Sequence, residues 1–240
     1  MTSEIRRLHL GHFTAPATNP LAGQRVVVTA FLIKHPDGLF LLDTGIGTGN
    51  DEAEKMYKPV RWNLRTQLSK AGVAPDDVRT VANCHLHFDH AGGNFLFPGT
   101  PIFAQAREHA LAHEPDYTIP GPVCDFDDAR FELLSGEAEP VPGIRIIPTP
   151  GHTDGHQSLV VDTAKGRIVL AGQAFNFANE YAAARYALSL ARAGSDAPGY
   201  PSWVARFDEF DPVKVLFAHD YAIWERTPDV DAPPAVPAVG

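Results

Sequence analysis

Short apolar runs separated by turn residues recur along the first half of the chain. Residues 26–33 and 39–42 are rich in β-branched and aromatic side chains, and His35-Pro-Asp-Gly38 between them has the chemistry of a tight turn. These runs predict a β-hairpin. Residues 62–71 have helical spacing and are followed by Gly72, and residues 78–84 form another short apolar strand.

The second half repeats this order. Residues 156–162 and 167–171 predict a second hairpin, and residues 213–218 a final strand. In each half the hairpin runs into a glycine-containing loop, and a later strand ends at a histidine. Residues 172–199, between hairpin and final strand, predict an irregular or helical insert. Strands interleaved with helices predict an α/β fold in which two mixed sheets pack face to face and are covered by helices.

Composition limits the class of protein. With 240 residues, 44% hydrophobic and 20% charged, the chain has the make-up of an ordinary globular protein. We predict a single domain over residues 1–226 and a proline-rich tail over residues 227–240, which holds four prolines. The net charge of −9 argues against a nucleic-acid partner. A homodimer is left open.

Nothing in the sequence predicts export or a membrane partner. The first thirty residues lack the apolar run of a leader peptide, and no stretch reaches the apolar length of a membrane span. Two cysteines, Cys84 and Cys124, provide no disulfide framework. We expect a cytoplasmic protein with a small-molecule substrate.

The strongest chemical signal is the segment His85-Leu-His-Phe-Asp-His90. Imidazole nitrogens and carboxylate oxygens are the ligands that suit zinc and related divalent metals. Four such side chains this close together would otherwise need several hydrogen-bond partners or stay in water. Packing alone does not explain the segment, so we predict a metal site.

Three further segments belong to the same prediction. His152, Gln173 and His219 each follow a predicted strand, as the segment at 85–90 does. Ligands at the ends of strands can meet at one edge of a sheet. We therefore expect all four segments to converge.

At this point the sequence resembles the metallo-β-lactamase superfamily, through His-x-His-x-Asp-His, the later Gly-His-Thr-x-Gly-His and the last histidine after an apolar strand. The N-acyl homoserine lactonase-like branch is the most similar in style and length. The resemblance covers residues 26–220 and implies a four-layer αβ/βα sandwich with one or two Zn²⁺ ions, other divalent metals remaining open. It implies that the first metal is held by His85, His87 and His152. It implies that the second is held by Asp89, His90 and His219.

The resemblance implies a hydrolase. Three histidines leave a coordination position for water, and a metal-bound hydroxide could open a lactone or cleave a related ester, with Asp89 as the catalytic carboxylate. Opening acyl homoserine lactones would amount to quorum quenching. A thioester, as in glyoxalase II, or a β-lactam is the alternative substrate. A mononuclear iron redox enzyme or a non-catalytic metal-binding protein is the alternative class.

Two positions depart from the family pattern. Gln173 stands where the superfamily usually has an aspartate that bridges both metals, and an amide offers only one oxygen and no charge. We expect a complete first site and a second site of lower affinity; Gln173 could also merely bond a metal-bound water. Asn176 stands where the lactonases usually have a tyrosine, and it could be an oxyanion donor or an ordinary loop residue.

Several neighbours have open roles. His156 is expected to hold the loop around His152, and Asp43 and Asp220 could either accept from the free nitrogen of a ligand histidine or cap loops. Cys84 should point away from the metal face, as a small buried residue. His109 and His113 are expected on an exposed polar face with Glu108 and Glu114. Aromatic residues of the insert could line a substrate pocket or pack the insert onto the sheets: Phe175, Phe177 and Tyr181 beside Asn176.

Overall fold

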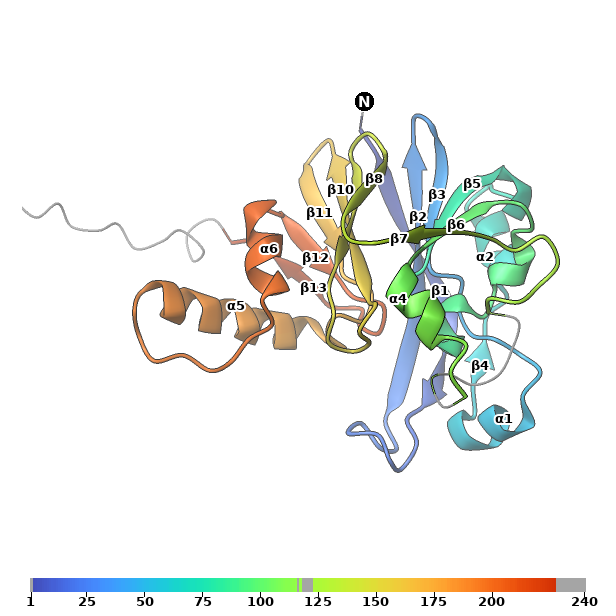
Figure 1. The fold of residues 1–240 in the computed structure, drawn as a ribbon, viewed down its shortest axis with the longest axis horizontal. Coiled ribbons are helices and arrows are strands. Elements are labelled where there is room, and N and C mark those ends of the chain that lie inside the picture. The colour runs from blue at the N-terminus through green and yellow to red at the C-terminus, as the bar shows by residue number, and fades with distance from the viewer. Residues whose placement is uncertain (1, 116, 118–122, 228–240) are drawn as a thin grey trace, which may run out of the picture.

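The structure is a computed structural model that describes residues 2–115, 117 and 123–227. In this part of the chain the strands form two mixed sheets packed face to face (Figure 1). The seven-stranded sheet has the order β4-β1-β2-β3-β5-β6-β7, and the six-stranded sheet the order β13-β12-β11-β10-β9-β8. The first sheet contains β1 (Glu4–Thr14), β2 (Arg25–His35), β3 (Gly38–Leu42), β4 (Val60–Arg61), β5 (Val78–Ala82), β6 (Pro101–Gln105) and β7 (Arg130–Leu134). The second contains β8 (Ala138–Val141), β9 (Ile144–Pro148), β10 (Gln157–Thr163), β11 (Gly166–Leu170), β12 (Lys214–Leu216) and β13 (Ile223–Glu225).

Helices flank the two sheets on their outer sides. In Figure 1, α1 and α2 lie beside the first sheet, and α5 and α6 beside the second. The α-helices of the described residues are α1 (Asp51–Tyr57), α2 (Leu64–Lys70), α3 (Phe88–Ala91), α4 (Ala106–Leu111), α5 (Ala178–Arg192) and α6 (Trp203–Glu209). Two 3₁₀ turns complete them, η1 (Pro75–Asp77) and η2 (Asn94–Leu96).

Alternation along the strands builds the layers. In β2, Val28, Ala30 and Leu32 belong to the apolar cluster on the outer face of the first sheet, whereas Phe31 and Ile33 belong to the cluster between the sheets. This is the period of two that a strand buried on both faces requires. A third cluster joins the outer face of the second sheet to α5 and α6. Three apolar layers therefore hold four layers of secondary structure, which confirms the predicted αβ/βα sandwich.

The two halves share one connection pattern. β2 and β3 form the predicted hairpin, with His35 paired to Gly38, and β3 then pairs parallel with β5. β10 and β11 form the second hairpin, and β11 pairs parallel with β12. The parallel strand of each half leads directly into a histidine segment, so the internal repeat positions the site.

The predictions for the insert, the domain boundary and the tail have different outcomes. The insert at 172–199 contains α5, a helix of 15 residues, while the pattern gave no sign of α1 or β13. The single-domain boundary at 226 stays a prediction, and the tail at 227–240 lies outside the described residues except for Thr227. None of the described helices combines the length and the apolar character needed to cross a bilayer.

The core between the sheets gives a stability prediction. Phe31 is fully buried there, whereas Phe95 has 44% of its surface exposed. Phe31→Ala should lower the free energy of unfolding by about 3–5 kcal/mol, because it leaves a cavity between the sheets. Phe95→Ala should change it by about 0.5 kcal/mol or less. Urea unfolding of both variants checks this, and equal losses would contradict the assigned core.

Candidate metal centre

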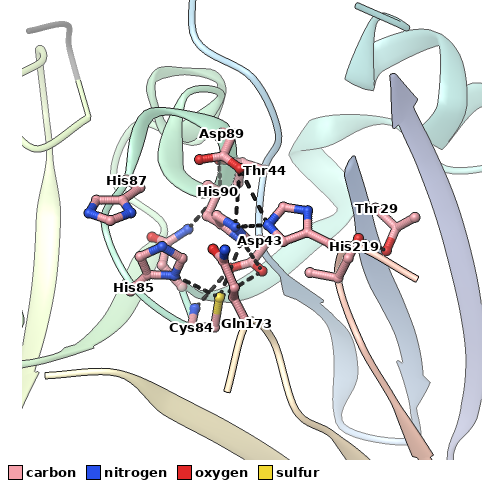
Figure 2. A network of polar contacts seen from close by, with 12 residues as sticks. Thr29, Asp43, Thr44, Cys84, His85, His87, Asp89, His90, Gln173 and His219 are labelled. Atoms are coloured by element: carbon pink, nitrogen blue, oxygen red, sulfur yellow. Dashed lines mark hydrogen bonds and ion pairs between the residues drawn. The ribbon is translucent and has the colours of Figure 1, made fainter. Parts of the chain in front are cut away.

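The four sequence segments converge at one edge of the sandwich. Figure 2 shows three of them, at residues 84–90, 173 and 219. The segment from Cys84 to His90 follows β5, His152 follows β9, Gln173 follows β11 and His219 follows β12. Among the described residues, four groups of potential ligand atoms have their members within 4.8 Å of one another, and two of these groups consist of the predicted ligands: His85, His87 and His152, and Asp89, His90 and His219. The other two contain Cys84, one with His85 and His156 and one with Asp43 and His90.

The first group consists of three facing imidazoles. Nε2 of His152 lies 3.1 Å from Nδ1 of His87, and the ring centroid of His85 lies 4.5 Å from that of His87 and 4.7 Å from that of His152. Nε2 of His85 is buried and has no hydrogen-bond partner among the described residues. A buried ring nitrogen without a partner is costly, and a metal ion satisfies it. The group therefore fits a divalent cation.

The protonation state of the first group also suits a metal. Burial lowers the pKa of His85 well below its usual value, that of His87 to about 4 and that of His152 to about 3. These imidazoles are neutral at neutral pH, which is the form that binds metal. His85 lies at the buried end of the group and His152 at the exposed end, so the group opens to solvent on one side.

The second group is almost wholly buried. Nε2 of His90 lies 3.1 Å from Nε2 of His219, and Oδ2 of Asp89 lies 3.4 and 3.5 Å from these two atoms. Although burial opposes its charge, the carboxylates of Asp89 and Asp43 raise the pKa of His90 well above its usual value, while burial lowers the pKa of His219 to about 4. Two imidazole nitrogens and one carboxylate oxygen thus face one another, a set of donor atoms that suits a metal cation.

Asp43 orients His90 from outside the group. Its backbone has φ 65°, and its Oδ2 accepts from Nδ1 of His90 at 3.0 Å while Oδ1 accepts from the backbone N–H of Cys84 at 2.8 Å. Because Nδ1 carries the donated proton, Nε2 is directed toward His219. Of the two roles open for Asp43, the geometry favours the one that fixes a histidine.

Asp220 has the second of these two roles, which is to cap a loop. His219 donates from Nδ1 to the carbonyl of Val27 at 2.7 Å, not to Asp220. Asp220 accepts from the backbone N–H of Ala178 with Oδ2 and from that of Ala222 with Oδ1, both at 2.9 Å. It therefore caps the start of α5 and the turn after His219, and it does not orient a histidine of the site.

Cys84 is buried as expected, but it does not point away from the histidines. Its Sγ lies 3.2 Å from Nδ1 of His85, 3.3 Å from Nδ1 of His90 and 3.1 Å from Oδ2 of Asp43. The alternation of a strand does not apply here, because β5 ends at Ala82. Burial raises the pKa of the thiol to about 12, so Cys84 contributes a neutral S–H group.

His156 and Gln173 hold each other in place. Nε2 of His156 accepts from the backbone N–H of Gln173 at 3.0 Å, which leaves Nδ1 to donate to Oγ1 of Thr149 at 2.8 Å. Both nitrogens of His156 are thus occupied. The Gln173 side chain points into the site in Figure 2, and its NH₂ donates to Oδ1 of Asn176 at 3.0 Å, which leaves Oε1 to face the ligand groups.

The insert aromatics pack mainly against the second sheet. Tyr181 is fully buried among Phe207, Phe217 and Trp224, so it does not line a substrate pocket. Phe175 stacks on Trp203 with 5.0 Å between ring centroids. Phe177 is half-buried just before α5, where its backbone N–H donates to Glu180. Of the two roles that the sequence left open for these aromatic residues, packing of the insert onto the sheet accounts for Phe175 and Tyr181.

Sequence reasoning missed several residues around the site. Phe13, from β1, lies 6.1 Å from His219 between ring centroids, and Tyr57 and Phe88 pack beside it. Glu108, expected on an exposed face, is buried and bonds the two histidine loops. No local pattern marks these residues, because each reaches the site through tertiary packing.

Comparison with known proteins identifies the family of this chain. The family model described as the metallo-beta-lactamase superfamily matches residues 23–225. N-acyl homoserine lactonases from Bacillus cereus and Azorhizobium caulinodans are 32% and 30% identical, over 60% of this chain and 61% and 63% of theirs. The chain thus matches less than two thirds of the length of these relatives.

Solved structures show the same fold. An N-acyl homoserine lactone hydrolase, with the product N-hexanoyl-L-homoserine at its catalytic metal centre, has a TM-score of 0.69 and 25% identity, over 92% of this chain and 95% of that one. A quorum-quenching N-acyl homoserine lactone hydrolase has a TM-score of 0.68 and 27% identity, over 92% and 94%. Since the family model covers most of its length, the chain belongs to the metallo-beta-lactamase superfamily.

Proposed function

We propose that this chain is a metal-dependent hydrolase that opens the ring of a lactone, with an N-acyl homoserine lactone as the leading substrate. The observation that carries the proposal is the convergence of two ligand groups at one edge of the sandwich, including a buried His85 Nε2 without a partner among the described residues. The lactonases among its relatives and structural neighbours support the substrate class. Related esters are the alternative substrates.

We assign the metal sites from these groups. His85, His87 and His152 would hold the first ion, and Asp89, His90 and His219 the second. Nitrogen-rich ligands with one carboxylate suit zinc. A divalent cation bound here supplies Lewis acidity toward the substrate carbonyl and a nucleophile at neutral pH.

The side chains of the site have defined tasks in this proposal. Asp43 and the carbonyl of Val27 hold His90 and His219 with their Nε2 atoms inward. Asp89 is the catalytic carboxylate, positioned to accept a proton from the attacking water. The exposed His152 marks the side from which a substrate can enter. Zinc as the native metal, quorum quenching and a cytoplasmic location remain predictions.

The two sites should differ in affinity. Asp89 is the only carboxylate in the six-residue ligand set, and the neutral amide of Gln173 has its NH₂ bonded to Asn176. Two neighbouring dications repel each other, and a single negative charge offsets that repulsion only in part. We therefore propose a complete first site and a weaker second site.

Hydrolysis is tested directly. The zinc-loaded chain should open N-hexanoyl-L-homoserine lactone, and a chelator should abolish this. His85→Ala should lower kcat/KM by more than about 100-fold, because it removes a buried ligand, while the exposed His113→Ala should leave it unchanged. A panel of lactones, p-nitrophenyl esters, thioesters and a chromogenic β-lactam defines the class. No turnover on any of them, with His85→Ala behaving as wild type, refutes the proposal.

Metal analysis tests the two-site assignment. Titration of the metal-free chain with Zn²⁺ should give two steps of different affinity, and dialysis against a mild chelator should remove the second ion first. Elemental analysis of the dialysed protein should then give about one ion per chain. Two ions of equal, chelator-resistant affinity would contradict the assignment.

Gln173→Asp tests the cause of the difference. The new carboxylate should tighten binding of the second ion by at least about 10-fold, because it adds a negative charge near two cations. Gln67→Asp on α2, which adds the same charge outside the site, is the matched control. Unchanged second-ion affinity in Gln173→Asp would show that this side chain does not contact the metals.

A further inference from the structure

Glu108 on α4 is a buried carboxylate outside the ligand groups. Only 1% of its surface is exposed. It accepts from the backbone N–H of Leu86 through Oε1 at 2.9 Å and from the Thr153 hydroxyl through Oε2 at 2.7 Å. The backbone N–H of Gly155 is a third neighbour that favours the charged form of the carboxyl and so opposes the rise in its pKa that burial causes. None of these three partners carries a charge. Taking a carboxylate out of water is costly, so these hydrogen bonds have to offset a large desolvation penalty.

The three partners belong to two different loops of the site. Leu86 lies between His85 and His87, and Thr153 directly follows His152. One side chain therefore bonds both segments that supply the three-histidine group. These segments are about 65 residues apart in the sequence, as the separation of His87 and His152 shows.

The backbones at this junction are in close contact. A Cβ atom added to Gly155 would lie 2.4 Å from the backbone nitrogen of Glu108 and 2.6 Å from its Cα. The first turn of α4 thus rests directly on the loop at 152–156, and only glycine allows this approach. The helix and the loop form one packed unit, which gives the carboxylate a fixed place from which to act.

The other ligand group has separate supports. The carbonyl of His90 accepts from Thr44 and from the Asn83 amide, and Nδ1 of His90 is held by Asp43. His219 is held by Val27. A change at Glu108 should therefore affect the three-histidine group more than the group of Asp89, His90 and His219.

We propose that Glu108 is a positioning residue that sets the separation of the loops carrying His85, His87 and His152, and thereby the affinity of this group for its metal ion. The inference rests on the proposed function only in taking these histidines as metal ligands. A carboxylate suits the task because both of its oxygens accept, while the backbone N–H groups of Leu86 and Gly155 can only donate. An amide would turn an NH₂ group toward donors.

The test measures metal binding on the purified full chain. Glu108→Gln and Thr153→Val are titrated with Co²⁺ in competition with a chelator, and their absorption spectra and circular dichroism are recorded. The exposed Glu114→Gln is the matched control. Loss of a residue that holds a metal ligand in place typically weakens the affinity for the metal by about 10–100-fold. Glu108→Gln should weaken the first Co²⁺ by about 10-fold and change its d–d spectrum, with the second ion affected less. Thr153→Val should show a smaller change in the same direction.

Two results overturn the inference. The first is a folded Glu108→Gln protein with wild-type affinity and spectrum for the first ion. The second is an equal loss of affinity for both ions together with a lower melting temperature, since this indicates general destabilisation. If Glu108→Gln does not fold, Thr153→Val decides, because it removes one hydroxyl at nearly constant volume.

Failure of this inference is distinguishable from failure of the proposed function. A wild-type chain that binds Co²⁺ but opens no lactone refutes the lactonase, while a selective effect of Glu108→Gln on the first ion still supports the positioning role. A wild-type chain that binds no Co²⁺ overturns both.

Discussion

The site depends on one constraint: each of three buried imidazoles is held at one nitrogen so that the other faces inward. Nδ1 of His90 is bonded to Asp43, and Nδ1 of His219 to the carbonyl of Val27. Nδ1 of His85 contacts the sulfur of Cys84, while its Nε2 has no partner in the described part of the chain. Ligands that are oriented in advance need little rearrangement to bind a cation. A carboxylate, a main-chain carbonyl and a thiol thus serve the same purpose.

The fold supplies these supports because loops from both sheets approach closely at one edge. Gly172, at φ 56°, shows how tight this approach is, since a Cβ there would lie 2.3 Å from Cβ of Cys84. The loop after β11 can therefore reach the loop after β5 only with glycine at this position. The internal repeat of hairpin and parallel strand sets up the meeting, and the glycine permits it.

The sequence was sufficient for the parts of the structure that local chemistry determines. Alternating residues and the Pro-Asp-Gly turn predicted the hairpin of β2 and β3. The spacing of histidines predicted a metal site, and the family resemblance implied the two ligand groups that lie together in the structure. It was insufficient where a side chain's partner comes from elsewhere. Glu108 looks like a surface residue of a short helix, and only packing against the loop at 152–156 buries it. Asp220 follows a site histidine, yet its partners are the start of α5 and the next turn.

The hydrogen bond from His219 to Val27 joins the two sheets at the site, since β2 belongs to the first sheet and His219 follows a strand of the second. Thr29 strengthens this contact between the sheets, because its N–H and its hydroxyl both donate to the carbonyl of Ala218. Each ligand group also draws members from both halves of the chain. An ion that binds there would hold the two halves together, because a ligand that binds only the folded state stabilises that state. The stability of the sandwich and the occupancy of the site are in this way thermodynamically linked. Removing the ion would weaken the contact between the sheets as well as abolish the reaction.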